Sequence, residues 1–372
     1  MQLRLLQAEG FNPLPHGTGH YVAALKTKKG ELEALAHTSP QTWSRLTPLI
    51  QILGTKNPKG PLKAPTVRNW MKNVASALGD HPFFLDILRL RPAQTTLTAA
   101  GKQPVLGCLY QAARKRDLQF VPVFSVGDAS PSYLNLVRDA TLHDGRGVAL
   151  RWNVVQTMPP PGSTLTDLLS KTLTTLETDF KSADLLLDLG YLPPDVDLPA
   201  DNIAASVNEA AKAGAWRNIV LLGTSIPATL GCIPEGEVSA IPRREWELWS
   251  ALSNPNFKLK RLPSYGDYAI QHPKPPQEDS GMGMRANIRY TTKNVTLIAR
   301  GRGAVVQEGK QQYSELCRQL TKQSEFAGAD FTWGDRIIQG CADGVIPPGA
   351  QDLWRAVGTS HHLRLVTDQL PR

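Results

Sequence analysis

Charged and aromatic side chains stand at or near the ends of several short apolar runs in the 372-residue chain. A lysine, two arginines, three aspartates and a tyrosine make up the set: Lys26, Asp86, Arg89, Arg151, Asp188, Asp267 and Tyr268. If the runs are parallel strands, these side chains converge on one edge, where guanidinium groups could grip a phosphorylated or carboxylated ligand. The alternative is an ion-pair network that only holds loops in place.

Two of the aspartates, Asp86 and Asp188, lie inside or beside apolar runs. A lone carboxylate in such surroundings is costly, so each is expected to have a cationic partner. Lys26 and Arg151 are the candidates, because their strands would lie near enough for the side chains to meet.

Other candidate sites are weaker. Thr224 and Ser225 follow an apolar run and could donate hydrogen bonds to a phosphate. His361 and His362 are adjacent rather than four apart, and H-E-x-x-H is absent, so no metal site is predicted. The chain also lacks a G-x-S-x-G elbow, a Walker loop and a G-x-G-x-x-G fingerprint, and no cofactor is predicted.

The elements that must position these residues follow from the apolar pattern. Eight apolar runs are expected as strands: 21–25, 46–53, 83–90, 120–126, 148–155, 184–192, 218–224 and 259–270. Seven segments of helical spacing lie between them: 31–35, 67–78, 102–116, 133–142, 165–180, 203–213 and 246–252. This alternation predicts the α/β class and a single (β/α)8 domain resembling a TIM barrel.

The predicted organisation has four parts. Residues 1–20 form an N-terminal arm, 21–272 the barrel, 273–285 a Pro/Gly-rich loop, and 286–372 a hairpin and helical part packed on the barrel. The hairpin is expected at 286–300 and the helix at 311–323, followed by a polar tail. Segment 226–242 is expected to be irregular.

Composition points to a globular cytoplasmic protein. No run approaches the roughly 20 apolar residues of a membrane helix, and the four cysteines form no C-x-x-C pair.

The net charge is +8, and residues 1–118 hold 16 Lys and Arg against 6 Asp and Glu. A basic patch is predicted in a stretch without acidic residues: Lys56, Lys59, Lys63, Arg68 and Lys72. It would suit a nucleic acid or merely keep the surface soluble.

Several segments resemble the Beta family, named for the Beta protein of a coliphage satellite. They are Tyr21–Lys26 with Gly30–Leu35, Leu46–Ile52, Tyr265–Tyr268, Ile288–Thr291, Arg300–Gly301 and Trp354–Leu363. The family usually has Pro at the position of Ala23 and Glu at that of Gln51, and an amide cannot act there as a general base. Polar residues of the matching segments are further candidates for a shared pocket: Asp267, Arg289, Tyr290 and His362.

The resemblance implies membership of a mobile-element anti-phage module, in which such proteins restrain or license a toxic effector. The expected function is therefore binding, with that effector, a nucleic acid on the basic patch or a phage-derived ligand as partner, and no membrane. A barrel enzyme acting on a phosphorylated or nucleotide-like substrate at the rim is the alternative. An inert scaffold for the effector is a third possibility.

Overall fold

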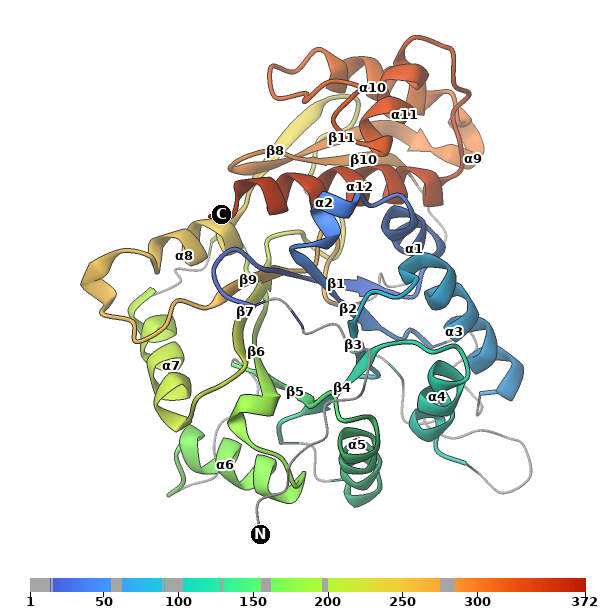
Figure 1. The fold of residues 1–372 in the computed structure, drawn as a ribbon. Coiled ribbons are helices and arrows are strands. Elements are labelled where there is room, and N and C mark those ends of the chain that lie inside the picture. Colours follow the sequence, from blue (N-terminus) through green and yellow to red (C-terminus); the bar gives the residue numbers. More distant parts are fainter. Residues whose placement is uncertain are drawn as a thin grey trace.

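A closed barrel of eight parallel strands forms the centre of the molecule (Figure 1). The computed structural model describes residues 14, 16–54, 62–88, 90, 103–127, 130–154, 162–195, 200–274 and 285–372. The barrel strands are β1 (Tyr21–Lys26), β2 (Leu46–Gln51), β3 (Phe83–Asp86), β4 (Phe120–Ser125), β5 (Val148–Asn153), β6 (Ala183–Tyr191), β7 (Asn218–Thr224) and β9 (Ser264–Asp267). Tyr265 of β9 pairs with Leu221 of β7 and Tyr21 of β1, which closes the ring. The predicted (β/α)8 barrel is confirmed.

Helices surround the barrel strands. They are α1 (Lys29–Ala36), α2 (Pro40–Trp43), α3 (Ala64–Leu78), α4 (Val105–Arg114), α5 (Pro131–Asp144), α6 (Leu165–Thr175), α7 (Ala200–Ala213) and α8 (Arg244–Ala251), with short 3-10 helices η2 (Phe180–Ser182) and η3 (Pro255–Phe257). Helix α6 begins at a capping box, where the Thr164 hydroxyl accepts from the Asp167 amide and the Asp167 carboxylate accepts from the Thr164 amide. The predicted end of this helix at residue 180 was wrong, because α6 ends at Thr175 and η2 is a separate short helix after it.

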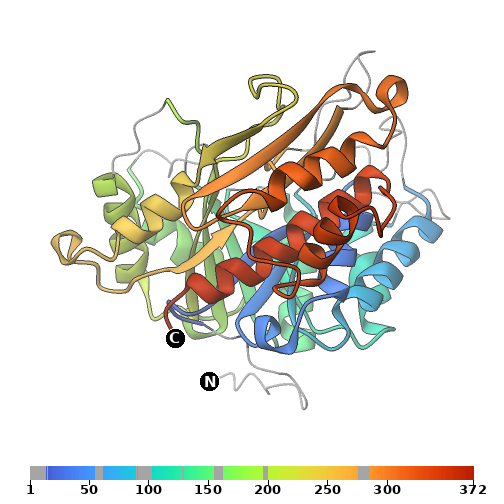
Figure 2. The same ribbon diagram turned by 90° about the horizontal axis from the view of Figure 1, so that it is seen from above.

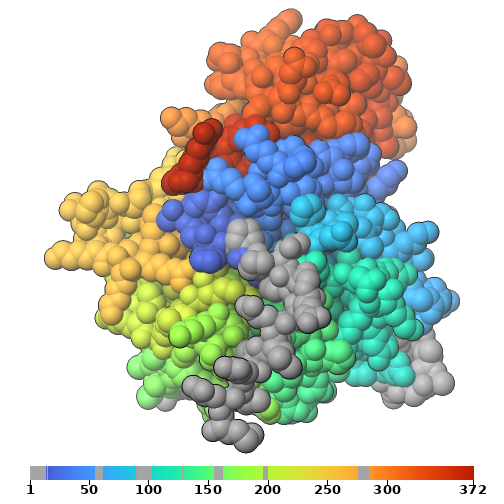
Figure 3. Space-filling model, viewed as in Figure 1, coloured from blue at the N-terminus to red at the C-terminus, as the bar shows by residue number. Residues whose placement is uncertain are grey.

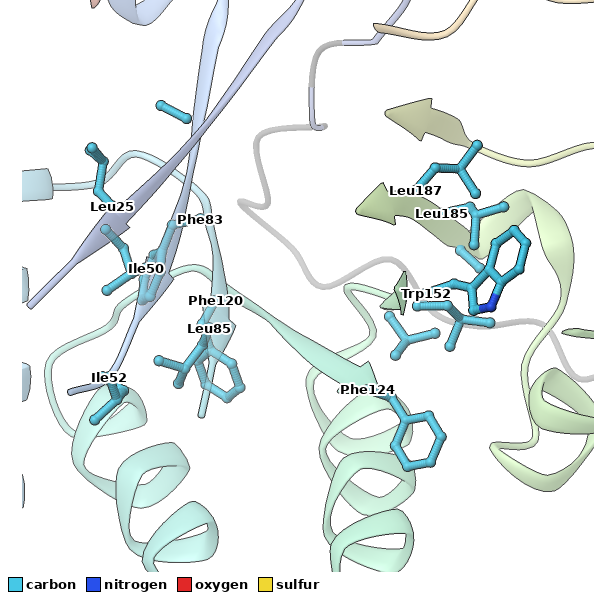
Figure 4. Close-up of a cluster of buried hydrophobic side chains, with 14 of the residues drawn as sticks. Leu25, Ile50, Ile52, Phe83, Leu85, Phe120, Phe124, Trp152, Leu185 and Leu187 are labelled. Carbon is cyan, nitrogen blue, oxygen red and sulfur yellow. The ribbon is translucent and has the colours of Figure 1, made fainter. Parts of the chain in front are cut away.

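Alternation along the strands divides the core into two layers. Outward side chains, such as Leu25, Ile50, Phe83 and Leu185, pack in the layer that the helices cover (Figure 4). Inward side chains form a smaller cluster: Val22, Ala24, Leu49, Phe84, Val121, Val123, Ala149, Leu186, Val220, Leu222 and Tyr268.

The described part of the arm, Leu14 and residues 16–20, lies at the amino end of the barrel. Leu14 is buried in the inner cluster. The Ser264 hydroxyl, at the start of β9, donates to the carbonyl of Gly17 at 2.6 Å. Leu14 and Gly17 therefore contact the barrel on the side opposite the predicted rim.

A second lobe lies on one side of the barrel (Figure 3). Its sheet has the order β10-β11-β8, with β8 (Val238–Pro242), β10 (Arg285–Thr291) and β11 (Val295–Ala304). Its helices are α9 (Val305–Glu308), α10 (Gln312–Thr321), α11 (Trp333–Ala342) and α12 (Gln351–Gln369). Helix α12 contacts both α1 of the barrel and β10 of the second sheet, and Figure 2 shows it along the boundary.

Two expectations about this lobe were wrong. Segment 226–242 contains β8, which leaves the barrel and pairs with β11 from Val238 to Pro242. The expected polar tail contains α11 and α12, and many polar residues of α12 are buried because other elements cover several of its sides.

Candidate functional site

The strand register brings several predicted rim residues to one level. Lys26 of β1 pairs with Gln51 of β2, and Gln51 pairs with Asp86 of β3. The side chains of these three residues point into the barrel, as do those of Arg151 of β5 and Asp188 of β6. All five are buried at the carboxyl end of the barrel. Arg89 lies outside the described residues.

Arg151 is the centre of a network that we call the rim cluster: Gln51, Asp86, Arg151, Asp188 and Tyr268. Its guanidinium bonds Asp188 Oδ2 from Nε at 3.0 Å and from Nη2 at 2.7 Å, and Nη1 forms an ion pair with Asp86. Nη2 also donates to the Tyr268 hydroxyl at 2.6 Å, which in turn donates to Asp188 at 2.7 Å. The Gln51 amide donates to Asp86 at 3.2 Å. The predicted cationic partner of both aspartates is therefore confirmed as Arg151.

Backbone amides complete the rim cluster. The amides of Leu88 and Gly190 donate to Asp86 Oδ1 and Asp188 Oδ1 at 2.8 and 2.9 Å. Burial opposes the charge of Arg151, but Tyr268, Asp188 and Asp86 outweigh it and raise the pKa of the guanidinium.

Lys26 anchors the neighbouring part of the rim. Its ammonium donates to the carbonyl of His272 at 2.5 Å, and its backbone amide donates to Glu31 of α1. The lysine thus ties β1 to the segment that follows β9.

Asp267 and His362 were predicted at the rim, and the structure places them elsewhere. Tyr268 faces inward, so Asp267 beside it faces outward, against α12. There it bonds His362 Nε2 at 2.9 Å and the hydroxyls of Tyr21 and Tyr265. His362 Nδ1 lies 2.8 Å from the Thr291 hydroxyl. We call Tyr21, Asp267, Thr291 and His362 the interface cluster.

The interface cluster has the residue types of a hydroxyl–histidine–carboxylate triad, but it is closed to substrate. Thr291 and Asp267 have no exposed surface and His362 is 2% exposed. Burial lowers the pKa of His362. Burial would raise the pKa of Asp267, but the charge and hydrogen bond of His362 outweigh it and lower that pKa. The cluster joins the barrel to the second lobe.

Tyr290 and Arg289 of β10 also lie away from the rim. The buried Tyr290 hydroxyl donates to Asp335 of α11 at 2.8 Å, and Asp335 lies 3.0 Å from His361 Nδ1. Tyr290 therefore belongs to the core of the second lobe. Arg289 donates to the carbonyl of Ile270 and lines a cleft beside α12.

The two hydroxyls proposed for phosphate have partners inside the protein. Ser225 donates to Glu245 at 2.5 Å and accepts from the Arg244 amide at the start of α8. Thr224 accepts from the amide of Ile226 at 3.1 Å and donates to the carbonyl of Gln271. A phosphate would first have to displace these bonds.

The basic patch is described only in part. Lys63, Arg68 and Lys72 are exposed at the start and on the outer face of α3, and Lys56 and Lys59 lie outside the described residues. In the described ranges, no group of His, Cys, Asp or Glu could hold a metal ion, and no helix is long and apolar enough to cross a bilayer.

Comparison with protein families gives one match, to the model described as Beta protein, over residues 21–368. The chain belongs to the Beta protein family. Curated proteins give no match. The match spans the barrel and the second lobe, so both parts belong to the family's shared sequence.

Two solved structures were matched with low TM-scores. One is a sugar phosphate isomerase/epimerase from Parabacteroides distasonis ATCC 8503, at 12% identity, with 74% of this chain and 92% of that chain covered and a TM-score of 0.30. The other is the carboxyl transferase domain of Rhizobium etli pyruvate carboxylase with pyruvate and biocytin, at 12% identity, covering 94% and 54%, with a TM-score of 0.30. Neither likeness bears on activity.

Sequence reasoning missed Arg243, Glu245, Arg355 and Trp354. Arg243 is almost fully buried and donates to the carbonyl of Thr292 at 3.0 Å. Its signal was weak, because Arg243 and Glu245 lie between segment 226–242, which was expected to be irregular, and the helix expected at 246–252. Arg355 and Trp354 were assigned to no helix.

Proposed function

We propose that this member of the Beta protein family is a binding component of a mobile-element anti-phage module, where it controls a neighbouring toxic effector protein. The mutual pairing of Arg151 with Asp86 and Asp188 carries the choice of binding over catalysis. Arg151, Asp86 and Asp188 satisfy one another at the position where a barrel enzyme would hold reactive groups. A buried network of this kind rigidifies the barrel opening.

The recognition surface for the effector therefore lies outside the rim cluster. Exposed charges of the second lobe can contact another protein without breaking a buried ion pair. A protein partner is favoured by the resemblance, and a nucleic acid on the basic patch is an outcome of the test below.

The first experiment separates binding from catalysis. The effector encoded beside this chain is co-expressed with wild type, Asp188→Asn or Asp184→Asn, and cell growth is measured. Asp184 is a matched control, because it lies on the same strand, is equally buried and pairs with Arg217 at the opposite end of the barrel. We expect Asp188→Asn and Asp184→Asn to have the same effect on cell growth when the amounts of folded protein are equal. Melting curves show whether each variant is folded. Loss confined to Asp188→Asn in a folded protein would support the enzyme hypothesis.

The second experiment identifies the class of partner. Binding of the purified effector, and of a labelled duplex DNA, is titrated at low and at physiological salt. Effector binding should depend modestly on salt, whereas binding to DNA would fall steeply. Arg68→Glu with Lys72→Glu should leave effector control intact, with Lys171→Glu and Lys212→Glu on α6 and α7 as the charge-matched control. If binding instead depends steeply on salt, and this dependence disappears only in the α3 variant, the partner is a nucleic acid.

A further inference from the structure

A cleft opens where the barrel meets the second lobe. Its lining comes from the segment after β9, from β10 and from the first turns of α12, and its enclosed volume is about 20 Å3. The polar lining consists of Gln271, Asn287, Arg289, Gln351 and Arg355, and Trp354 and Ile270 form apolar walls. Amide, guanidinium and indole groups thus surround one space.

The charge inside the cleft is mainly positive. Burial, followed by repulsion from Arg355, lowers the pKa of Arg289 to about 10. Burial and the charges of Arg355 and Arg289 also lower the pKa of Lys28, next to α1. The nearby carboxylates are Glu31, whose Oε2 accepts from the Lys26 amide, and Asp352, which lies 3.5 Å from Arg355. Among the described residues, Arg289 has no carboxylate at ion-pair distance.

A buried donor in the cleft wall is also unused. Trp354 is 2% exposed, and its indole Nε1 has no hydrogen-bond partner within the described ranges. A buried N–H without a partner costs about 1–3 kcal/mol. Buried donors of this kind are normally satisfied by protein, water or a ligand.

We propose that this cleft binds a small phosphate-bearing anion, held by the guanidinium groups of Arg289 and Arg355 and by the indole N–H of Trp354. A phosphoryl group suits it better than a carboxylate, because its three terminal oxygens can meet donors from β10 and α12 together. This site goes beyond the proposed function, since it involves neither the rim cluster nor the effector. A bound phosphate would contact both lobes where they join.

Inorganic phosphate is the probe for this site. It is titrated into the full chain, and binding is followed by the 31P NMR line width and by the melting temperature. Sodium chloride at equal ionic strength controls for screening, and sodium acetate tests a carboxylate. We expect saturable broadening and a rise in melting temperature with phosphate, and neither effect with chloride or acetate.

Variants assign the contacts. Arg355→Gln and Trp354→Phe should each weaken phosphate binding by roughly tenfold, as expected for loss of a hydrogen bond to a charged group. Arg289→Lys keeps the charge but loses the planar fork, so it should also bind more weakly. Arg364→Gln, farther along α12, is the control and should bind within about twofold of wild type, because neither Arg364 nor its partner Asp368 lines the cleft.

Three results would overturn the proposal. The first is that wild type responds to phosphate no more than to chloride. The second is that acetate gives as strong a response as phosphate. The third is that Arg355→Gln and Trp354→Phe both bind phosphate as tightly as wild type. Because Trp354 is a core residue, melting curves without phosphate establish that each variant is folded. Asp188→Asn should bind phosphate normally, which separates failure of this site from failure of the rim interpretation.

Discussion

Arg151 neutralises two carboxylates that otherwise lack a cation in the rim cluster. Replacing it with Leu leaves Asp86 and Asp188 buried and uncompensated, so the free energy of unfolding should fall by about 3–5 kcal/mol. Urea unfolding measures this change. Arg318→Ala breaks an exposed pair with Glu315 and should cost at most about 0.5 kcal/mol.

A rescue variant makes the same prediction sharper. Adding Asp86→Asn and Asp188→Asn to Arg151→Leu removes the uncompensated charge and should recover part of the lost stability. An Arg151→Leu protein within about 1 kcal/mol of wild type would contradict the role assigned to this ion pair.

Glu245 makes stability depend on pH. Burial raises the pKa of its carboxyl from 4.5 to about 7, against the opposing effects of Arg243 and Ser225. The folded state therefore holds this proton more tightly than the unfolded state. Stability from this group is complete below pH 4.5 and is lost as the pH rises through about 7, by roughly 3 kcal/mol in total.

The test compares wild type with Glu245→Gln by urea unfolding across this pH range. The variant cannot titrate but still accepts from Ser225, so its stability should fall less between pH 4.5 and 7 than that of wild type. Parallel stability curves for the two proteins would refute the assignment.

Some of these residue roles could be predicted from sequence and others could not. An aspartate in an apolar run requires a cation, and this argument led from Asp86 and Asp188 to Arg151. Asp267 was misplaced because the alternation of strand β9 was not used to decide which face it lies on. Tyr268 points inward, so its neighbour Asp267 must point outward. The histidine that compensates Asp267 lies 95 residues away, and no local pattern connects them.

At the scale of elements, α12 shows why the second lobe was harder to predict than the barrel. Barrel strands repeat one pattern, and each repeat supports the next. Helix α12 contacts α1, β10 and α11, so it has no single apolar stripe and resembles a polar segment in sequence. Strand β8 was also not predicted. Its alternation of apolar and polar residues is short, and its partner β11 comes much later in the chain.

Close packing of α12 gives a prediction for one glycine. A Cβ at Gly358 would overlap the carbonyl oxygen of Arg289 and approach Ile270 Cδ1 to 2.9 Å. Gly358→Ala should therefore lower the free energy of unfolding by about 1–3 kcal/mol. Gly107→Ala in α4 is the helical control, with Leu136 Cδ2 as its nearest contact at 3.3 Å, and should range from neutral to about 1 kcal/mol more stable. Equal effects at the two sites would show that α12 packs less closely than described.

At the scale of the whole molecule, barrel and second lobe should unfold together. The interface cluster joins them through buried hydrogen bonds, and β8, between β7 and β9 in sequence, belongs to the second sheet. We expect one calorimetric transition, with equal calorimetric and van't Hoff enthalpies. Two separated transitions would show that the lobes are independent. His362→Phe should broaden or split the transition by leaving Asp267 without its imidazole.

The hydrogen bond between Tyr21 and His362 joins residues 341 positions apart. On the ribosome, the opening strand must wait for almost all of the later chain before its hydroxyl meets that imidazole. Contacts of such long sequence separation slow folding and leave nascent intermediates open to aggregation. Emergence of α12 from the ribosome, rather than emergence of the barrel repeats, is therefore the moment at which these contacts can first form.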